Sequence, residues 1–261
     1  MEDRAQNQSK KTQNIGEEIM EKKNEREEMQ NKVMTQAEFT AKITEAHFNN
    51  RRNDNNFHNI AAADAVIEGK NLGNAEFHFA KMTNVRFSRC NLTYSEFKFA
   101  EFENVTFENC KMDRSYFNFA KMHGVQFKNC VLDGSEYDFA EGDAAFESCS
   151  MENSEFNMAS LKLTLTKCAT ARSEFNGCGN LHVTIENSDF TRVEMNDSTV
   201  RGTMQNTVFS NGEFKGSNGT ALSVTSSKVR DVETDGSIGF SETSDDDDDE
   251  DIDKMLDEVF K

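Results

Sequence analysis

The chain has 261 residues with 47 acidic and 29 basic side chains, which gives a formal net charge of −18. Such an acidic chain lacks the net basic surface that binding to phosphate backbones requires, so we expect no direct contact with nucleic acid. It also contains no long apolar segment and no signal-peptide pattern, so we expect a cytoplasmic protein that is neither exported by the general secretory route nor anchored in a membrane.

The N-terminal region, residues 1–56, is rich in Glu, Lys, Gln and Asn, which predicts a polar segment that is only partly helical. Thr35 and Glu38 have the spacing of a helix capping box. Phe39, Ile43 and Ala46 then fall on one helical face. We therefore expect a helix over about residues 36–48 that covers the first coil of the fold that follows, with residues 57–71 as a linker into that coil.

Residues 72–217 repeat every five residues, and each unit resembles the unit four places back more closely than its neighbours. The small residue of successive units follows the order Ala, Val, Cys, Ser three times, from Ala80 to Ser135. A large apolar residue comes two positions after each small one. Because a period of five fits neither an α-helix nor a flat strand, each unit predicts one side of a four-sided coil. The pattern predicts an all-β solenoid of about seven coils.

In such a solenoid the small and large residues point inward, and the other three residues of each unit face water. Stacked coils lie about 4.8 Å apart, and no coil buries its apolar face without its neighbours. Five cysteines fall in one inward column and form the predicted structural core ladder: Cys90, Cys110, Cys130, Cys149 and Cys168. Cysteine in this column is a small core residue of a reducing compartment. A straight column cannot converge four thiolates on one ion, so we expect no metal site.

Two intervals in the cysteine column are one residue short. Cys130 and Cys149 are 19 residues apart, as are Cys149 and Cys168, whereas the earlier intervals are 20. One residue is therefore lost at a corner in each of these two coils, and we expect a local kink near residues 142–145 and another near residues 161–167. In the second segment, leucines alternate with polar residues as in an ordinary strand.

The repeats resemble those of the pentapeptide-repeat protein family. The family consensus is a small residue, then Asp or Asn, then Leu or Phe, then two variable positions, and Cys90-Asn91-Leu92 matches it. The resemblance covers a little over half of the chain. It implies a right-handed quadrilateral β-helix, but it implies no single function, because proteins with this fold serve unrelated roles.

The C-terminal region changes character twice. Residues 218–250 are rich in Ser, Thr and Gly and then in Asp, which predicts a disordered acidic linker. Residues 251–261 are predicted to form a short amphipathic docking helix that folds on a partner, with a basic groove as the matching surface. The alternative is a solvated, frayed tail. The candidate docking residues are Ile252, Met255, Leu256, Val259 and Phe260.

An outward column of apolar residues is the candidate interface. Stacking would align these residues into one stripe: Phe79, Phe99, Phe119, Phe139 and Met158. A contiguous exposed apolar patch is typical of a covered or binding surface. Either the N-terminal region or a corner turn covers the stripe, or its side chains only stack on one another, or it binds a second copy or another protein.

We expect no catalytic residue, metal or cofactor. The five histidines share no spacing, no glycine-rich phosphate loop is present, and the serines of the inward column are core residues. The sequence therefore favours a non-enzymatic scaffold for protein-protein interaction, in which the acidic tail captures a second partner.

Two other functions are open. Some members of the family imitate duplex DNA and inhibit type II topoisomerases, which suggests a DNA-mimicking modulator of such an enzyme or of another DNA-binding protein. Basic residues interrupt the first coils here, so mimicry would use a later face near residues 136–155. A secreted bacterial effector is the third possibility, although no residue argues for it.

Overall fold

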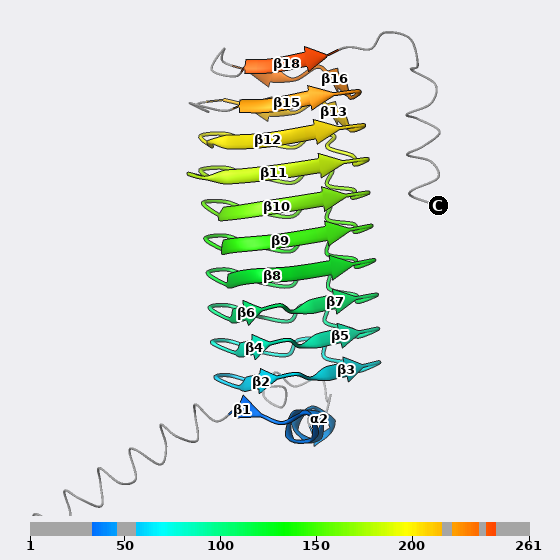
Figure 1. Cartoon of the computed structure of the whole chain (residues 1–261), viewed down its shortest axis with the longest axis vertical. Coiled ribbons are helices and arrows are strands. Elements are labelled where there is room, and N and C mark those ends of the chain that lie inside the picture. Colours follow the sequence, from blue (N-terminus) through cyan, green and yellow to red (C-terminus); the bar gives the residue numbers. More distant parts are fainter. Residues whose placement is uncertain (1–32, 46–55, 216–220, 235–238, 244–261) are drawn as a thin grey trace, which may run out of the picture.

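The computed structural model describes residues 33–45, 56–215, 221–234 and 239–243. Its strands stack as parallel rungs along one long axis, and the one helix among the described residues lies at the N-terminal end of the stack (Figure 1). The fold is the expected right-handed quadrilateral β-helix, with about 8 turns rather than seven.

The elements follow the chain along the rod. Helix α2 spans Gln36–Glu45, and the strands are β1 (Val33–Met34), β2 (Ala61–Ala63), β3 (Val66–Glu68), β4 (Lys81–Thr83), β5 (Arg86–Ser88), β6 (Glu101–Glu103), β7 (Thr106–Glu108), β8 (Lys121–Lys128), β9 (Glu141–Glu147), β10 (Ser160–Thr166), β11 (Leu181–Glu186), β12 (Val200–Gln205), β13 (Val208–Ser210), β14 (Glu213–Phe214), β15 (Ala221–Thr225), β16 (Lys228–Arg230), β17 (Glu233–Thr234) and β18 (Gly239–Thr243).

Parallel pairing between successive coils builds each side of the square. One side runs β2-β4-β6-β8 and the next β3-β5-β7-β8, and both continue upward through β9. Bridges such as Asn71↔Asn91 and Glu76↔Glu96 form the other two sides. Partners in these coils are 20 residues apart, as the repeat predicts.

The interior is filled by columns of like side chains. In one column, stacked rings run from Phe57 through Phe77 and Phe97 to Phe117, with centroids 4.8 to 5.0 Å apart. The small residues between them are also buried, including Ala80, which has no exposed surface. Parallel rings at this spacing add stacking to the burial of apolar area, so each coil stabilises the next.

Helix α2 closes the N-terminal end. Glu38 N–H donates to Thr35 Oγ1 (3.3 Å) and Thr35 N–H donates to Glu38 Oε2 (2.8 Å), which confirms the predicted capping box. Phe39 and Ile43 are fully buried in the same core as the coils, and the Phe39 ring meets the edge of Phe87 at 6.5 Å. Residues 46–48 of the predicted helix, including Ala46, lie outside the described residues.

The solenoid begins before residue 72, so residues 57–71 form a coil and not the predicted linker. Strands β2 and β3 pair in register with β4 and β5. The repeat is hard to recognise here because the large and the small inward residue of one unit have exchanged positions. Ile60 occupies the small position and Ala62 the large one, and both are buried. Because the pair fills about the same volume in either order, the core tolerates the exchange.

The solenoid also extends past residue 217. Strands β15, β16 and β17 add a further coil on β12, β13 and β14, and β18 pairs with β15. Leu222 and Val224 are buried in this coil, within the stretch predicted to be a disordered linker. The inward residues were missed because most of their neighbours in this stretch are polar residues or glycine. Its Thr and Val residues are nevertheless compatible with strands. The acidic run of residues 245–251 lies outside the described residues.

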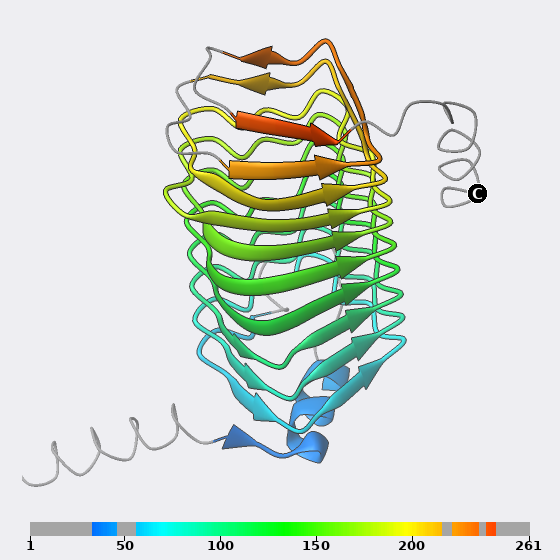
Figure 2. The same ribbon diagram turned by 45° about the horizontal axis from the view of Figure 1, so that its top comes forward.

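The predicted loss of a corner residue is confirmed at the first short interval, and the strand pairing is irregular there, near the first expected kink. In the first coils, Asn84 and Asn104 turn the chain with φ of 55° and 53° between two short strands. In β9 the equivalent residue is missing, so the pairing shifts between Met122 and Val125 of β8. Strands β9, β10 and β11 then run unbroken across two former sides, and the upper coils lack the sharp bend of the lower ones (Figure 2).

The second expected kink is absent. Strand β10 pairs with β9 in unbroken register from Ser160↔Glu141 to Thr166↔Glu147. Both strands have lost the same corner residue, so they match each other. The ordinary strand predicted here is confirmed, because Leu161, Leu163 and Leu165 are buried in alternation along β10.

Gly142 is required where the corner disappears. Its φ is +112°, and an added Cβ would lie 1.8 Å from the carbonyl oxygen of Met122. We predict that Gly142→Ala lowers the free energy of unfolding by about 3 kcal/mol or more, because the backbone itself must move. Gly179→Ala is the control, since a Cβ there meets nothing within 4 Å, and it should change stability by less than about 0.5 kcal/mol. Chemical denaturation measures both, and equal stabilities would contradict the lost-corner geometry.

Candidate protein-interaction surface

The outward apolar residues form one continuous column at a corner of the rod, which we call the aromatic column. Its members are Phe79, Phe99, Phe119, Phe139 and Met158, each with 44 to 57% of its surface exposed. The four rings stack in parallel with centroids 5.0, 4.8 and 4.8 Å apart. No described segment covers them. The column thus combines the contiguity and the exposure typical of a binding surface.

The column lies where the backbone enters the left-handed region. Its five residues have φ between 55° and 61°. Bulky side chains are unfavourable in this conformation, whereas Asn and Gly adopt it readily. The same corner position is filled by Asn59 one coil below the column and by Gly177 one coil above it, with φ of 56° and 69°. Folding alone therefore favours Asn or Gly here, and the chain carries aromatic residues instead.

On one side of the column, the carboxylates of the lower coils contact basic side chains. His58 Nε2 lies 2.9 Å from Glu76 Oε2, and His78 Nε2 lies 2.9 Å from Glu96 Oε2. Lys98 Nζ is 3.0 Å from Glu96 Oε2. The carboxylates beside Phe79 and Phe99 thus have basic partners within the rod.

On the same side, the upper coils carry carboxylates without basic partners. In the described part of the chain no ion pair involves Glu136, Glu155 or Glu174, which stack in successive coils. Their contacts are amides: Asn118 Nδ2 donates to Glu136 at 3.0 Å, and Asn157 Nδ2 donates to Glu155 at 3.4 Å. This stretch beside Phe139 and Met158 is therefore negative.

Burial and mutual repulsion act on these carboxylates. Burial, together with the carboxylates of Asp138, Glu136 and Glu174, raises the pKa of Glu155. Burial also raises the pKa of Asp138, with Glu136 and Glu174 adding to the effect. Raised carboxylate pKa values indicate that the negative charge is poorly compensated within the rod.

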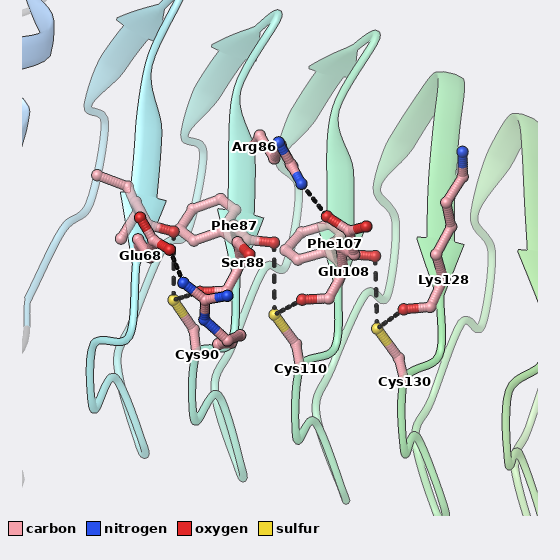
Figure 3. Close-up of polar contacts among 12 residues, drawn as sticks. Glu68, Arg86, Phe87, Ser88, Cys90, Phe107, Glu108, Cys110, Lys128 and Cys130 are labelled. Atoms are coloured by element: carbon pink, nitrogen blue, oxygen red, sulfur yellow. Dashed lines mark hydrogen bonds and ion pairs between the residues drawn. The ribbon is translucent and has the colours of Figure 1, made fainter.

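The five predicted ladder cysteines are all buried. Figure 3 shows Cys90, Cys110 and Cys130 at equivalent places in successive coils. Cys90 Sγ lies 3.5 Å from the carbonyl oxygens of Ile67 and Ser88, and the thiols above it repeat this contact. The neighbouring Cys130 thiol and burial raise the pKa of Cys110 to about 11. Buried thiols that stay protonated are poor nucleophiles and poor metal ligands. The geometry supports a packing role for the column.

Residues 80–141 match the model of the family described as "Pentapeptide repeat region". This chain contains a pentapeptide-repeat region. No curated protein sequence matches it.

Two solved structures similar to this pentapeptide-repeat protein are QnrB1 and HetL. QnrB1, a plasmid-mediated fluoroquinolone resistance protein, is 16% identical, with 69% of this chain and 91% of that chain covered and a TM-score of 0.32. HetL, involved in heterocyst differentiation regulation in the cyanobacterium Nostoc sp. strain PCC 7120, is 13% identical, with 79% and 100% covered and a TM-score of 0.36. At these values the likenesses carry no argument about function.

The docking residues at positions 252–260 lie outside the described residues. Within the described ranges, no group of three or more His, Cys, Asp or Glu residues could hold a metal ion. No described helix has the length and apolar character of a membrane-spanning segment.

The sequence predicted the aromatic column. It did not predict that the column residues adopt an unfavourable left-handed backbone conformation, or that unpaired carboxylates lie beside the upper ones. The left-handed backbone could have been noticed, because Asn59 occupies the corner position one repeat before Phe79. The split between paired and unpaired carboxylates depends on which residues of different coils are adjacent. It could be found only by placing His78, Lys98 and Asp138 in one column.

Tyr137 is the one described core ring that carries a hydroxyl, and this hydroxyl has no hydrogen-bond partner. The ring stacks between Phe117 and Phe156 at 5.0 and 4.4 Å. We predict that Tyr137→Phe raises the free energy of unfolding by about 1 kcal/mol, because it removes an unsatisfied buried polar group. Phe117→Tyr should lower it by a similar amount. Thermal denaturation checks both, and a lower midpoint for Tyr137→Phe would mean that the hydroxyl has a partner.

Proposed function

We propose that this pentapeptide-repeat protein is a non-enzymatic interaction scaffold that binds a partner protein through the aromatic column. The single observation that carries the proposal is the exposed, stacked column at corner positions with positive φ. A bulky residue in this conformation costs about 1 to 2 kcal/mol relative to residues that accept it. Stacking of exposed rings returns about 0.5 to 1.5 kcal/mol per pair, so stability gives little net reason for the column.

The rod suits this role because it is stiff. Each coil is held by backbone hydrogen bonds to both neighbours, for example from Lys81 N to Ile60 O (2.7 Å) and from Asn84 N to Glu103 O (2.8 Å). A rigid surface loses little conformational entropy when it binds. The C-terminal residues 251–261 remain our proposed second docking element, and through them the scaffold would hold two partners together.

DNA mimicry is the second candidate. One observation favours it: Glu136, Glu155 and Glu174 form a ladder of carboxylates without basic partners, one per coil, at about 4.8 Å. Phosphates of one DNA strand repeat every 3.4 Å or so along the axis, so the match in charge spacing is coarse. Inhibition of a type II topoisomerase that does not depend on the aromatic column would favour this candidate over the scaffold.

We predict that the triple variant Phe99→Asn, Phe119→Asn, Phe139→Asn loses its partner but keeps its fold. Asn is the residue found at Asn59 in the same corner, so the free energy of unfolding should change by less than about 1 kcal/mol per site. Partner binding is measured in the native host by cross-linking the rod surface to the proteins bound to it and comparing the proteins recovered with each variant. Tyr94→Asn is the matched control, because Tyr94 is an exposed aromatic residue with φ of 58° at another corner.

Loss of the same cross-linked partners in the Tyr94→Asn control, or full retention in the triple variant, would contradict the proposal. A large loss of stability in the triple variant, but not in the Tyr94→Asn control, would mean that the aromatic column stabilises the fold.

A further inference from the structure

The aromatic column and the carboxylates beside it together favour one class of partner. We propose that the docked segment is a basic amphipathic α-helix, lying parallel to the rod with its apolar stripe on Phe99 to Met158 and its Lys or Arg side chains against Glu136, Asp138 and Glu155. This inference rests on the interaction role proposed above and adds the chemistry of the partner.

The spacing of the rings favours a helix. Ring centroids repeat every 4.8 to 5.0 Å along the column. An α-helix presents its apolar stripe once per turn, every 5.4 Å or so, whereas an extended strand repeats on one face about every 6.7 Å. Over three intervals the helix drifts by about 1.6 Å from the rings, which side chains can absorb. The strand drifts by about 5.5 Å, which is a whole ring.

The charge beside the column favours basic side chains, and it favours them at one end. Glu76 and Glu96 next to the lower rings are already paired with His58, His78 and Lys98. Glu136, Glu155 and Asp138 next to the upper rings have no described ion pair and accept hydrogen bonds from amides.

Two other occupants fit less well. A second copy would bring the same carboxylates without described ion pairs, at Glu136, Asp138 and Glu155, so the two acidic flanks would repel each other. The proposed C-terminal helix of this chain carries Asp253, Asp257 and Glu258, so the acidic flank would repel it.

The test uses the full chain and labelled synthetic peptides of roughly 18 residues, long enough to follow the column. One peptide carries leucines at helical spacing with arginines beside them, a second replaces each arginine with glutamate, and a third alternates arginine and leucine as a strand. Fluorescence anisotropy should show the basic helix binding at least about tenfold more tightly than either other peptide, with an affinity that falls as salt rises.

Variants of the chain locate the site. Glu136→Gln with Glu155→Gln should weaken binding of the basic helix about tenfold and reduce its salt dependence, whereas Glu76→Gln with Glu96→Gln should change it less than about twofold. Phe119→Asn should also weaken it, and Tyr94→Asn should not. The Gln variants keep the side-chain shape, and an unchanged melting temperature confirms that they fold.

Equal effects of the two Gln pairs would overturn the inference, because they would mean that the peptide binds the acidic chain without a site. Equal binding of the helical and alternating peptides would overturn it as well. So would sedimentation showing a dimer that Phe119→Asn dissociates. If the cross-linked partner still depends on the column while the basic helix fails to bind, this inference fails and the scaffold role stands.

Discussion

In-register hydrogen bonding between successive coils is the constraint on which the rest of the structure depends. Each coil donates backbone N–H groups to the coil below and to the coil above, as Glu96 N to Ala75 O (2.8 Å) and Phe97 N to Tyr116 O (2.6 Å) show. With the register held at 20 residues in the lower coils and at 19 where a corner residue is lost, equivalent positions lie directly above one another. The ring columns of the core, the cysteine column, the aromatic column and the carboxylate ladder are all consequences of that stacking.

The same constraint explains how the rod accommodates irregularity. Loss of a corner residue in β9 would break the register, but β10 has lost the same residue, so these two coils stack without a shift. Gly142 absorbs the mismatch where the two kinds of coil meet, because it has no side chain to strike Met122. These coils have one corner fewer than the lower coils, and the inward columns of side chains continue through them.

Much of this architecture could be predicted from the sequence, because a local period of five with like residues every 20 leaves few alternatives. The fold, the capping box at Thr35 and the inward cysteines follow from local pattern alone. The ends could not be placed, since Ile60 and Ala62 exchange sizes and Leu222 lies in a polar stretch. The candidate surface was visible as a column, but the contrast between paired and unpaired carboxylates depends on contacts between residues about 20 positions apart.

The reactivity of the cysteine thiols tests the stacked register most directly. If Cys90, Cys110, Cys130, Cys149 and Cys168 occupy one inward column, a small thiol reagent should modify none of them in the folded chain at neutral pH, and mass spectrometry should show all five becoming reactive together as denaturant unfolds the rod. Rapid modification of any one of the five in the folded chain would contradict the account, because that residue would face solvent and the columns above and below it would lose their alignment.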